Sequence, residues 1–153
     1  MVTYVLFLLQ MIIYNSLSFL IYMRFRNQPD EENRIYFIEL DGELKMPENI
    51  HSYPEVLSYA REHNYYKFVF DMRHVDINVN YFDSFHLIQH LDIIGLKRTD
   101  NIALIYSGKE ELFKFCETVA YNRGWHNFKF FGDYKEGKKW LLSYHPAKSE
   151  KAS

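Results

Sequence analysis

The chain has 153 residues, of which 48% are apolar, 25% are charged and 18% are aromatic. A chain of this length can bury one hydrophobic core without covalent staples, and its single cysteine, Cys116, excludes an intrachain disulfide and fits a reducing compartment. The formal net charge of −2 gives no general attraction for polyanions, so we expect no nucleic-acid partner.

The N-terminal segment, residues 2–23, contains no charged residue. About 20 apolar residues span a bilayer, so the segment is long enough for a membrane anchor, and Arg24 and Arg26 would then place the rest of the chain in the cytoplasm. In the interpretation that we favour, Leu20–Phe25 is the first strand of a cytoplasmic domain and residues 1–17 are an apolar extension. The alternative is a single-pass membrane protein whose domain faces the cytoplasm.

The first predicted strand forms a hairpin. Its partner is Ile35–Leu40, and the polar stretch Asn27–Asn33 is the loop between them. Asp41-Gly42 then predicts a turn, and a capping-box pattern opens a helix over Ser52–His63.

Two strands and a helix follow in the middle of the chain. The apolar run Tyr66–Asp71 predicts a buried strand, and the polar residues from Asp71 to Asn80 predict a loop. Tyr81–Ile94 has helical periodicity, which Gly95 ends, and Asn101–Tyr106 predicts the next strand.

The last part of the chain repeats the alternation. Ser107–Glu110 is a second capping box that opens a helix ending near Gly124. Phe128–Phe131 predicts the last strand, Asp133–Glu136 opens the final helix, and residues 146–153 are a polar tail. The alternation predicts one α/β domain over residues 18–145, with a mixed sheet of about five strands and helices packed against it.

Several short motifs occur in a fixed order between Asp30 and Leu142. They are Asp30–Ile35 at the entry to a strand, Asp41–Leu44, Phe70–Arg73 at the end of a strand, the helix end Glu117–Gly124, Phe131–Asp133 and Trp140-Leu141. Through these motifs about three quarters of the chain resembles the SpoIIAA-like branch of the STAS superfamily, also described as STAS/SEC14-like. The resemblance implies a single STAS-like domain, cytoplasmic and without established catalysis. Its relatives act as regulatory partners or bind apolar ligands.

One family motif departs from the pattern. The family's anti-sigma-factor antagonists carry a phosphorylatable serine in an Asp-Ser-Ser-Gly-like turn after the central strand. The nearest match here is Asp83-Ser84-Phe85-His86, which lies further from Asp71 and has large residues after the serine. Ser84 is therefore a candidate phosphorylation switch, because a phosphate is stabilised near a helix N-terminus. The alternative is a plain serine in the first turn of a helix.

Polar residues gather at two further places. Asp71 and Arg73, with His74 beside them, end a predicted strand, where open α/β sheets bind ligands; the alternative is a structural pair in which Asp71 accepts backbone N–H groups and binds Arg73. His86 and His90 have a zinc-compatible helical spacing, but two ligands do not complete a tetrahedral site. We therefore expect no metal site and no cofactor.

The motifs and spacings that carry known catalytic chemistry are missing from the sequence, so we expect no enzyme. We predict a regulatory or protein-interaction module with a protein partner. Its candidate interaction residues are Asp71, Arg73, His74, Phe82, Asp83, Ser84 and His86. The alternative is a domain that binds an apolar small molecule or lipid, with Phe82 and Phe85 among its lining residues and residues 2–23 as a membrane tether.

Overall fold

The computed structural model describes residues 23–44 and 53–143. The predicted extension at 1–17, the predicted cap at Ser52 and the predicted tail at 146–153 lie outside these residues. The described elements are β1 (Met23–Asp30), β2 (Ile35–Leu44), α2 (Tyr53–Glu62), β3 (Lys67–Ile77), α3 (Tyr81–Gln89), β4 (Asn101–Ile105), α4 (Glu110–Asn122), β5 (Phe128–Phe131) and α5 (Tyr134–Ser143).

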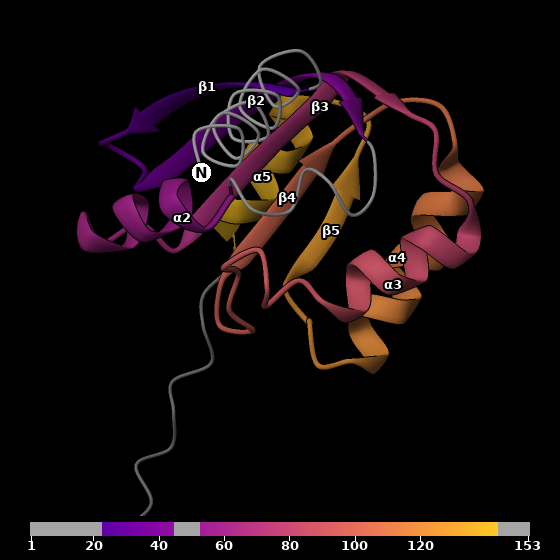
Figure 1. Cartoon of the computed structure of the whole chain (residues 1–153). Coiled ribbons are helices and arrows are strands. Elements are labelled where there is room, and N and C mark those ends of the chain that lie inside the picture. The colour runs from indigo at the N-terminus through magenta and orange to yellow at the C-terminus, as the bar shows by residue number, and fades with distance from the viewer. Residues whose placement is uncertain (1–22, 45–52, 144–153) are drawn as a thin grey trace, which may run out of the picture.

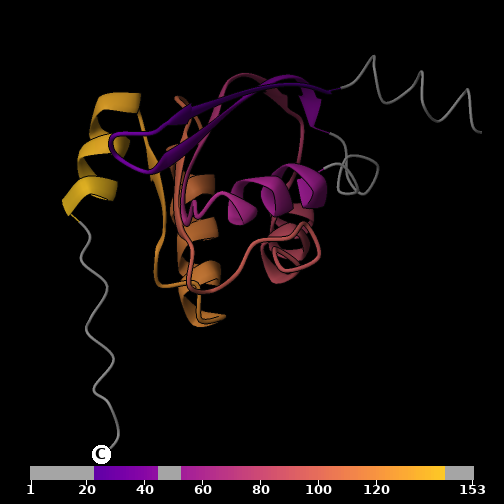
Figure 2. The ribbon, with the colours of Figure 1, turned by 90° about the vertical axis from the view of Figure 1, so that its left-hand side faces the viewer.

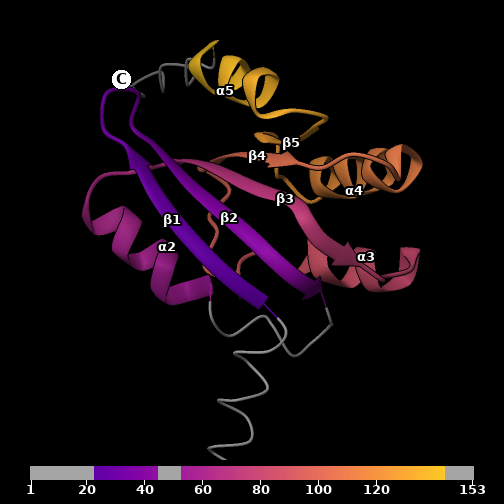
Figure 3. The same cartoon turned by 90° about the horizontal axis from the view of Figure 1, so that it is seen from above.

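The described strands form one five-stranded sheet in the order β1-β2-β3-β4-β5 (Figure 1). β1 and β2 are antiparallel, and each later strand is parallel to the one before it. Helices α2, α3 and α4 lie on one face of the sheet and α5 lies on the other (Figure 2 and Figure 3). The predicted α/β fold, with a mixed five-stranded sheet and an N-terminal hairpin, is confirmed.

The hairpin is longer than predicted. β1 continues to Asp30 and pairs with β2 along its whole length, so the predicted loop at Asn27–Asn33 is wrong and the turn occupies residues 31–34. The Asp30 carboxylate accepts hydrogen bonds from the backbone N–H (3.1 Å) and the side-chain amide (3.0 Å) of Asn33, which closes this short turn. Leu20–Tyr22 lie outside the described residues, so the strand prediction is confirmed only for Met23–Phe25.

β2 and β3 run side by side beyond their predicted ends. The turn predicted at Asp41-Gly42 and the loop predicted at 71–80 are therefore wrong: a β-bulge in β3 between Asp71 and His74 shifts the register opposite Glu39 and Asp41, and the pairing then continues to Leu44 and Ile77. Val75 and Ile77 are buried whereas the residues between and before them are exposed. This alternation of buried and exposed residues is typical of a strand, but the polar composition of the segment led to the loop prediction.

α3 is shorter than predicted. It ends at Gln89, whereas the periodicity predicted a helix to Ile94. Leu91 and Ile94 are nevertheless buried, because the turns after the helix keep them against the core. Gly95 ends this segment with φ +95°, and a Cβ there would lie 3.2 Å from the Cα of Pro54 in α2.

One of the predicted helix caps is confirmed and one is wrong. Asp133 Oδ1 accepts a hydrogen bond from the N–H of Glu136 (2.8 Å) at the start of α5, as predicted. At α4 the cap residue is Lys109 rather than Ser107, with a left-handed backbone (φ +79°) and no side-chain capping bond. The Lys109 ammonium group instead donates to the backbone carbonyl of Ile77, which joins α4 to the end of β3.

Apolar side chains form a cluster on each face of the sheet. The larger cluster lies between the sheet and α2, α3 and α4. The smaller one lies under α5 and consists of Ile35, Val69, Ala103, Ile105 and Leu141. Gly137 lets α5 approach closely, because a Cβ at this position would lie only 2.6 Å from Cδ1 of Ile105.

Candidate functional site

The outer side of α3 presents aromatic rings beside ionisable groups. We call Tyr81, Phe82, Asp83 and His86 the α3 surface. Tyr81 is 51% exposed and Phe82 70% exposed, and the Phe82 ring lies 4.4 Å from the His86 ring, four residues further along the helix. The Asn80 side chain accepts a hydrogen bond from the N–H of Asp83 (2.9 Å) and fixes where the helix begins. The predicted residues Phe82, Asp83 and His86 are thus brought together.

Ser84 lies on the inner side of the same helix. It is only 3% exposed, as is Ile88 one turn later. Ser84 lines an apolar cavity beneath α3, as does Cys116 of α4, and its buried hydroxyl has no hydrogen-bond partner among the residues that the structure describes. A kinase could reach this hydroxyl only after α3 moved, so phosphorylation of Ser84 stays a prediction.

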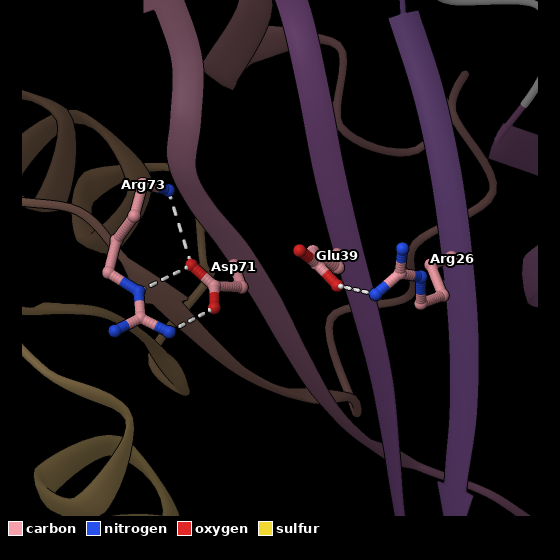
Figure 4. Close-up of polar contacts among 4 residues, drawn as sticks. All are labelled: Arg26, Glu39, Asp71 and Arg73. Atoms are coloured by element: carbon pink, nitrogen blue, oxygen red, sulfur yellow. Dashed lines mark hydrogen bonds and ion pairs between the residues drawn. The ribbon is translucent and has the colours of Figure 1, made fainter.

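Asp71 and Arg73 form a closed pair on β3 (Figure 4). The Asp71 carboxylate accepts hydrogen bonds from Nε (2.9 Å), a terminal guanidinium nitrogen (2.6 Å) and the backbone N–H (3.2 Å) of Arg73. Next to this pair, Arg26 of β1 binds Glu39 of β2 at 3.4 Å (Figure 4). The pairing foreseen as the structural alternative is therefore present.

The ion pair fixes the charge of both partners. Burial raises the pKa of Asp71, but the side-chain and backbone hydrogen bonds from Arg73 outweigh burial, and the pKa lies below its ordinary value. The same hydrogen bond raises the pKa of Arg73. A carboxylate held in this way is a poor general base, because its proton-accepting oxygens are already occupied.

The predicted site residues fall on two faces of the sheet. Asp71 lies two residues after Val69 in β3, so its side chain points to the face covered by α5. The α3 surface lies on the other side of the sheet (Figure 3). His74 is exposed on β3, on the far side of the bulge from Asp71. The sequence could not separate the two groups, because the path of the chain between them was predicted as a loop.

The two candidate zinc ligands sit differently with respect to α3. His86 lies within the helix, whereas His90 is the residue that caps its C-terminal end. Among residues 23–44 and 53–143, no group of three His, Cys, Asp or Glu side chains could hold a metal ion.

An apolar cavity of about 100 Å³ lies between the sheet and the two helices α3 and α4. Its walls include Leu40, Phe70, Ile88 and Phe113, and the described residues enclose it only in part. A void of this size costs on the order of 2 kcal/mol of stability when nothing fills it. Burial raises the pKa of Cys116, which lines the cavity, to about 11, so its thiol stays protonated at neutral pH.

A second buried ion pair was missed by the sequence analysis. Arg61 of α2 binds the carboxylate of Asp100, which also accepts a hydrogen bond from the N–H of Lys97 (2.7 Å). The Asp100 side chain is fully buried, and burial raises its pKa against the opposing effects of Lys97 and Arg61. The pair joins α2 to the segment before β4 and is structural. No sequence pattern links two residues this far apart.

Comparisons with known proteins bear on the fold. No family model matches the sequence, and no curated protein does. The structure is similar to an anti-sigma factor antagonist from Mycobacterium paratuberculosis, with a TM-score of 0.54 and 8% identity over 78% of this chain and 93% of that chain. It is also similar to an uncharacterised DUF3478-family protein with a SpoIIAA-like fold from Shewanella loihica, with a TM-score of 0.52, 18% identity and the same two coverages of 78% and 93%.

The chain has a SpoIIAA-like fold. The predicted STAS-type resemblance is confirmed at the level of fold, since identities this low show the fold alone. In this SpoIIAA-like domain the α3 surface and the Asp71–Arg73 pair occupy opposite faces of the sheet. None of the helices within the described residues is long and apolar enough to cross a membrane.

Proposed function

We propose that this SpoIIAA-like domain is a non-enzymatic regulatory module that binds a protein partner through the α3 surface. The observation that carries the proposal is Phe82, an aromatic side chain that is 70% exposed on a helix whose start is fixed by a side-chain cap. Large aromatic side chains on a rigid element are common anchors of protein interfaces. The fold neighbour named an anti-sigma factor antagonist supports a regulatory role and a protein as the partner.

The chemistry of the α3 surface suits a protein partner. Tyr81 and Phe82 provide apolar area, and Tyr81 is held against the ring of Phe115 in α4 at 5.1 Å, which limits its freedom. Asp83 and His86 add polar groups beside the rings, as at the rim of an interface. Asp71 makes a weaker candidate, because Arg73 already occupies its carboxylate. The resemblance places such a module in the cytoplasm, which stays a prediction.

The test is affinity capture from the source cell with the full chain as bait and quantitative mass spectrometry as the measurement. Phe82→Ala should reduce the recovery of a specific partner about tenfold or more, since loss of an interface anchor costs at least about 1.4 kcal/mol. Tyr121→Ala is the matched control, because Tyr121 is 62% exposed on α4 and lies 4.6 Å from the His126 ring. Equal recovery with wild type and Phe82→Ala contradicts the proposal.

The cavity favours a second candidate function, the binding of an apolar small molecule or lipid. Its lining is almost entirely apolar, and cavities of this kind exclude water and accept small apolar molecules. Native mass spectrometry of the full chain, purified gently and then exposed to different lipids and aromatic compounds, tests it. A chain that stays ligand-free throughout argues against this function. The predicted tether at residues 2–23 lies almost wholly outside the described residues.

A further inference from the structure

The wall of the apolar cavity contains a hydroxyl group. Of the described residues that line the cavity, Ser84 is the only one with a hydroxyl and Cys116 the only one with a thiol. Ser84 is 3% exposed, and its hydroxyl has no hydrogen-bond partner among the residues that the structure describes. A buried hydroxyl without a partner is unfavourable, and alanine, which forms helices better, would avoid the cost. The cavity wall thus carries one polar group that its described surroundings leave unsatisfied.

The usual partners of a buried helical serine do not serve Ser84. Such a hydroxyl commonly binds the backbone carbonyl four residues earlier. In α3 that carbonyl, of Asn80, accepts the backbone N–H of Ser84 at 3.0 Å, and the hydroxyl makes no hydrogen bond to it. Cys116 offers only a thiol, which is a weak donor and a weak acceptor. A buried water needs about two to four polar partners, which is more than the described lining provides.

The lining also limits which molecule can satisfy the hydroxyl. The described residues of the cavity wall carry no charged side chain, so a carboxylate or phosphate buried there would have no counter-ion. This argues against a fatty-acid carboxylate or a phospholipid head group inside the cavity. Its volume of about 100 Å³ equals that of roughly three molecules of liquid water, which suits a body of about four carbon atoms. An uncharged alcohol of this size brings both a donor and an acceptor.

We propose that the cavity binds a small uncharged alcohol, whose aliphatic body lies against the apolar walls and whose hydroxyl forms a hydrogen bond with Ser84. The inference rests on the second candidate function, the binding of an apolar small molecule, and specifies the ligand. Burial of the aliphatic body supplies most of the affinity. The hydrogen bond selects alcohols over molecules of the same shape that lack the hydroxyl, because these leave Ser84 unpaired.

Cys116 reports binding at this site. It is the only cysteine, it lines the cavity, and it is 6% exposed, so a bound ligand should slow its modification by the uncharged disulfide dithiodipyridine in the full chain. Titrations with 1-butanol and with 1-fluorobutane give two dissociation constants. Fluorine is close to a hydroxyl in size but donates no hydrogen bond and accepts one poorly. We expect Ser84→Ala to weaken the binding of butanol about tenfold and that of fluorobutane less than about twofold.

Ser107→Ala is the matched control, because Ser107 is exposed and is not among the described residues of the cavity wall, so both constants should keep their wild-type values. If Ser84→Ala changes the binding of the two ligands equally, or of neither, the proposed hydrogen bond is overturned and the binding of apolar molecules stands. If neither ligand slows the modification of wild type, both are overturned.

Urea unfolding without ligand is an independent test. The unfolding midpoint of Ser84→Ala should equal or exceed that of wild type, because the substitution removes a buried hydroxyl that has no partner. A marked fall in the midpoint would show that the hydroxyl is already hydrogen-bonded in the free protein, and would also overturn the proposal.

Discussion

Two buried aspartates each form an ion pair with an arginine, and the two pairs differ in how exposed the arginine is. Asp71 binds Arg73 two residues away, and this arginine side chain is 45% exposed, so the pair closes a local bulge at the surface. Asp100 binds Arg61 across 39 residues of sequence, and that arginine side chain is only 13% exposed. Removing one partner of a buried pair leaves the other charge uncompensated, which costs far more than breaking an exposed pair.

We expect Asp100→Ala to lower the free energy of unfolding by about 3 kcal/mol or more, because Arg61 would lose its counter-ion and the N–H of Lys97 its acceptor. Urea unfolding measures the change. Asp92→Ala is the control, since Asp92 is exposed and its carboxylate accepts a hydrogen bond from the N–H of its neighbour Ile93, so the change should be within about 0.5 kcal/mol. Equal effects of the two substitutions would contradict a structural role for the Arg61–Asp100 pair.

At the level of elements, β5 ends the described sheet and leaves one side of its backbone without a neighbouring strand. β5 contributes the carbonyl of Phe131 to the ladder with β4, where the N–H of Tyr106 donates to it. The N–H of Phe130 instead donates to the carboxylate of Glu117 in α4 at 2.7 Å. Glu117 thus occupies a donor that another strand could otherwise use for pairing.

We expect Glu117→Ala to promote self-association, because it frees the Phe130 N–H at the sheet edge. Sedimentation velocity over a range of concentrations should show association about tenfold stronger than in wild type, with stability lowered by about 1 kcal/mol. Glu111→Ala removes the same charge from an exposed position of the same helix and should sediment as wild type. Two indistinguishable variants would show that Glu117 does not protect the edge.

The elements that sequence predicts well are those with an uninterrupted apolar period. The strands around Phe68, Ile102 and Phe128 and the inner face of α4 were placed correctly for this reason. The ends of β2 and β3 were missed, because Asp41-Gly42 has turn composition and only pairing with a neighbouring strand makes it strand. Pairing with a neighbouring strand decides whether such segments are strand or turn, and a single sequence does not show which strands pair.

The candidate site was only partly predictable for the same reason. Phe82, Asp83 and His86 are local to one helix, so their spacing placed them together. The burial of Ser84 depends on which side of α3 meets α4, and Cys116 opposite it lies 32 residues later. The cavity beneath them arises from six elements and the turns between them, and the sequence gives no sign of it beyond a high aromatic content.

At the scale of the whole molecule, one ion pair joins the first hairpin to the last helix. Lys138 of α5 donates to the Asp30 carboxylate at 2.7 Å, across 108 residues of sequence. The hydrogen bond from Lys138, followed by those from Asn33, lowers the pKa of Asp30 from 3.8 to about 2. A lowered pKa stabilises the fold above the unfolded-state value, and the contribution is lost as the pH falls towards the folded-state value.

We therefore expect Asp30→Asn to lower the free energy of unfolding by about 1 kcal/mol at neutral pH, a figure reduced for solvent screening because both side chains are partly exposed. The difference from wild type should shrink between about pH 4 and pH 2. Urea unfolding at several pH values measures it. Asp76→Asn, at an exposed position of β3, is the control and should not reproduce this trend. A difference that stays constant with pH would exclude the linkage.

The order of the strands in the sheet is also their order along the chain, and this has a consequence for synthesis. Each strand from β2 onward docks beside one that left the ribosome before it, so the sheet can be extended at a single growing border without any later insertion. Of the described elements α5 is synthesised last, and it covers the second face of the sheet. Its Lys138 then binds Asp30 of the β1–β2 hairpin, which is the first of the described elements to be synthesised. The contact between α5 and the hairpin can therefore form only after α5 has been synthesised.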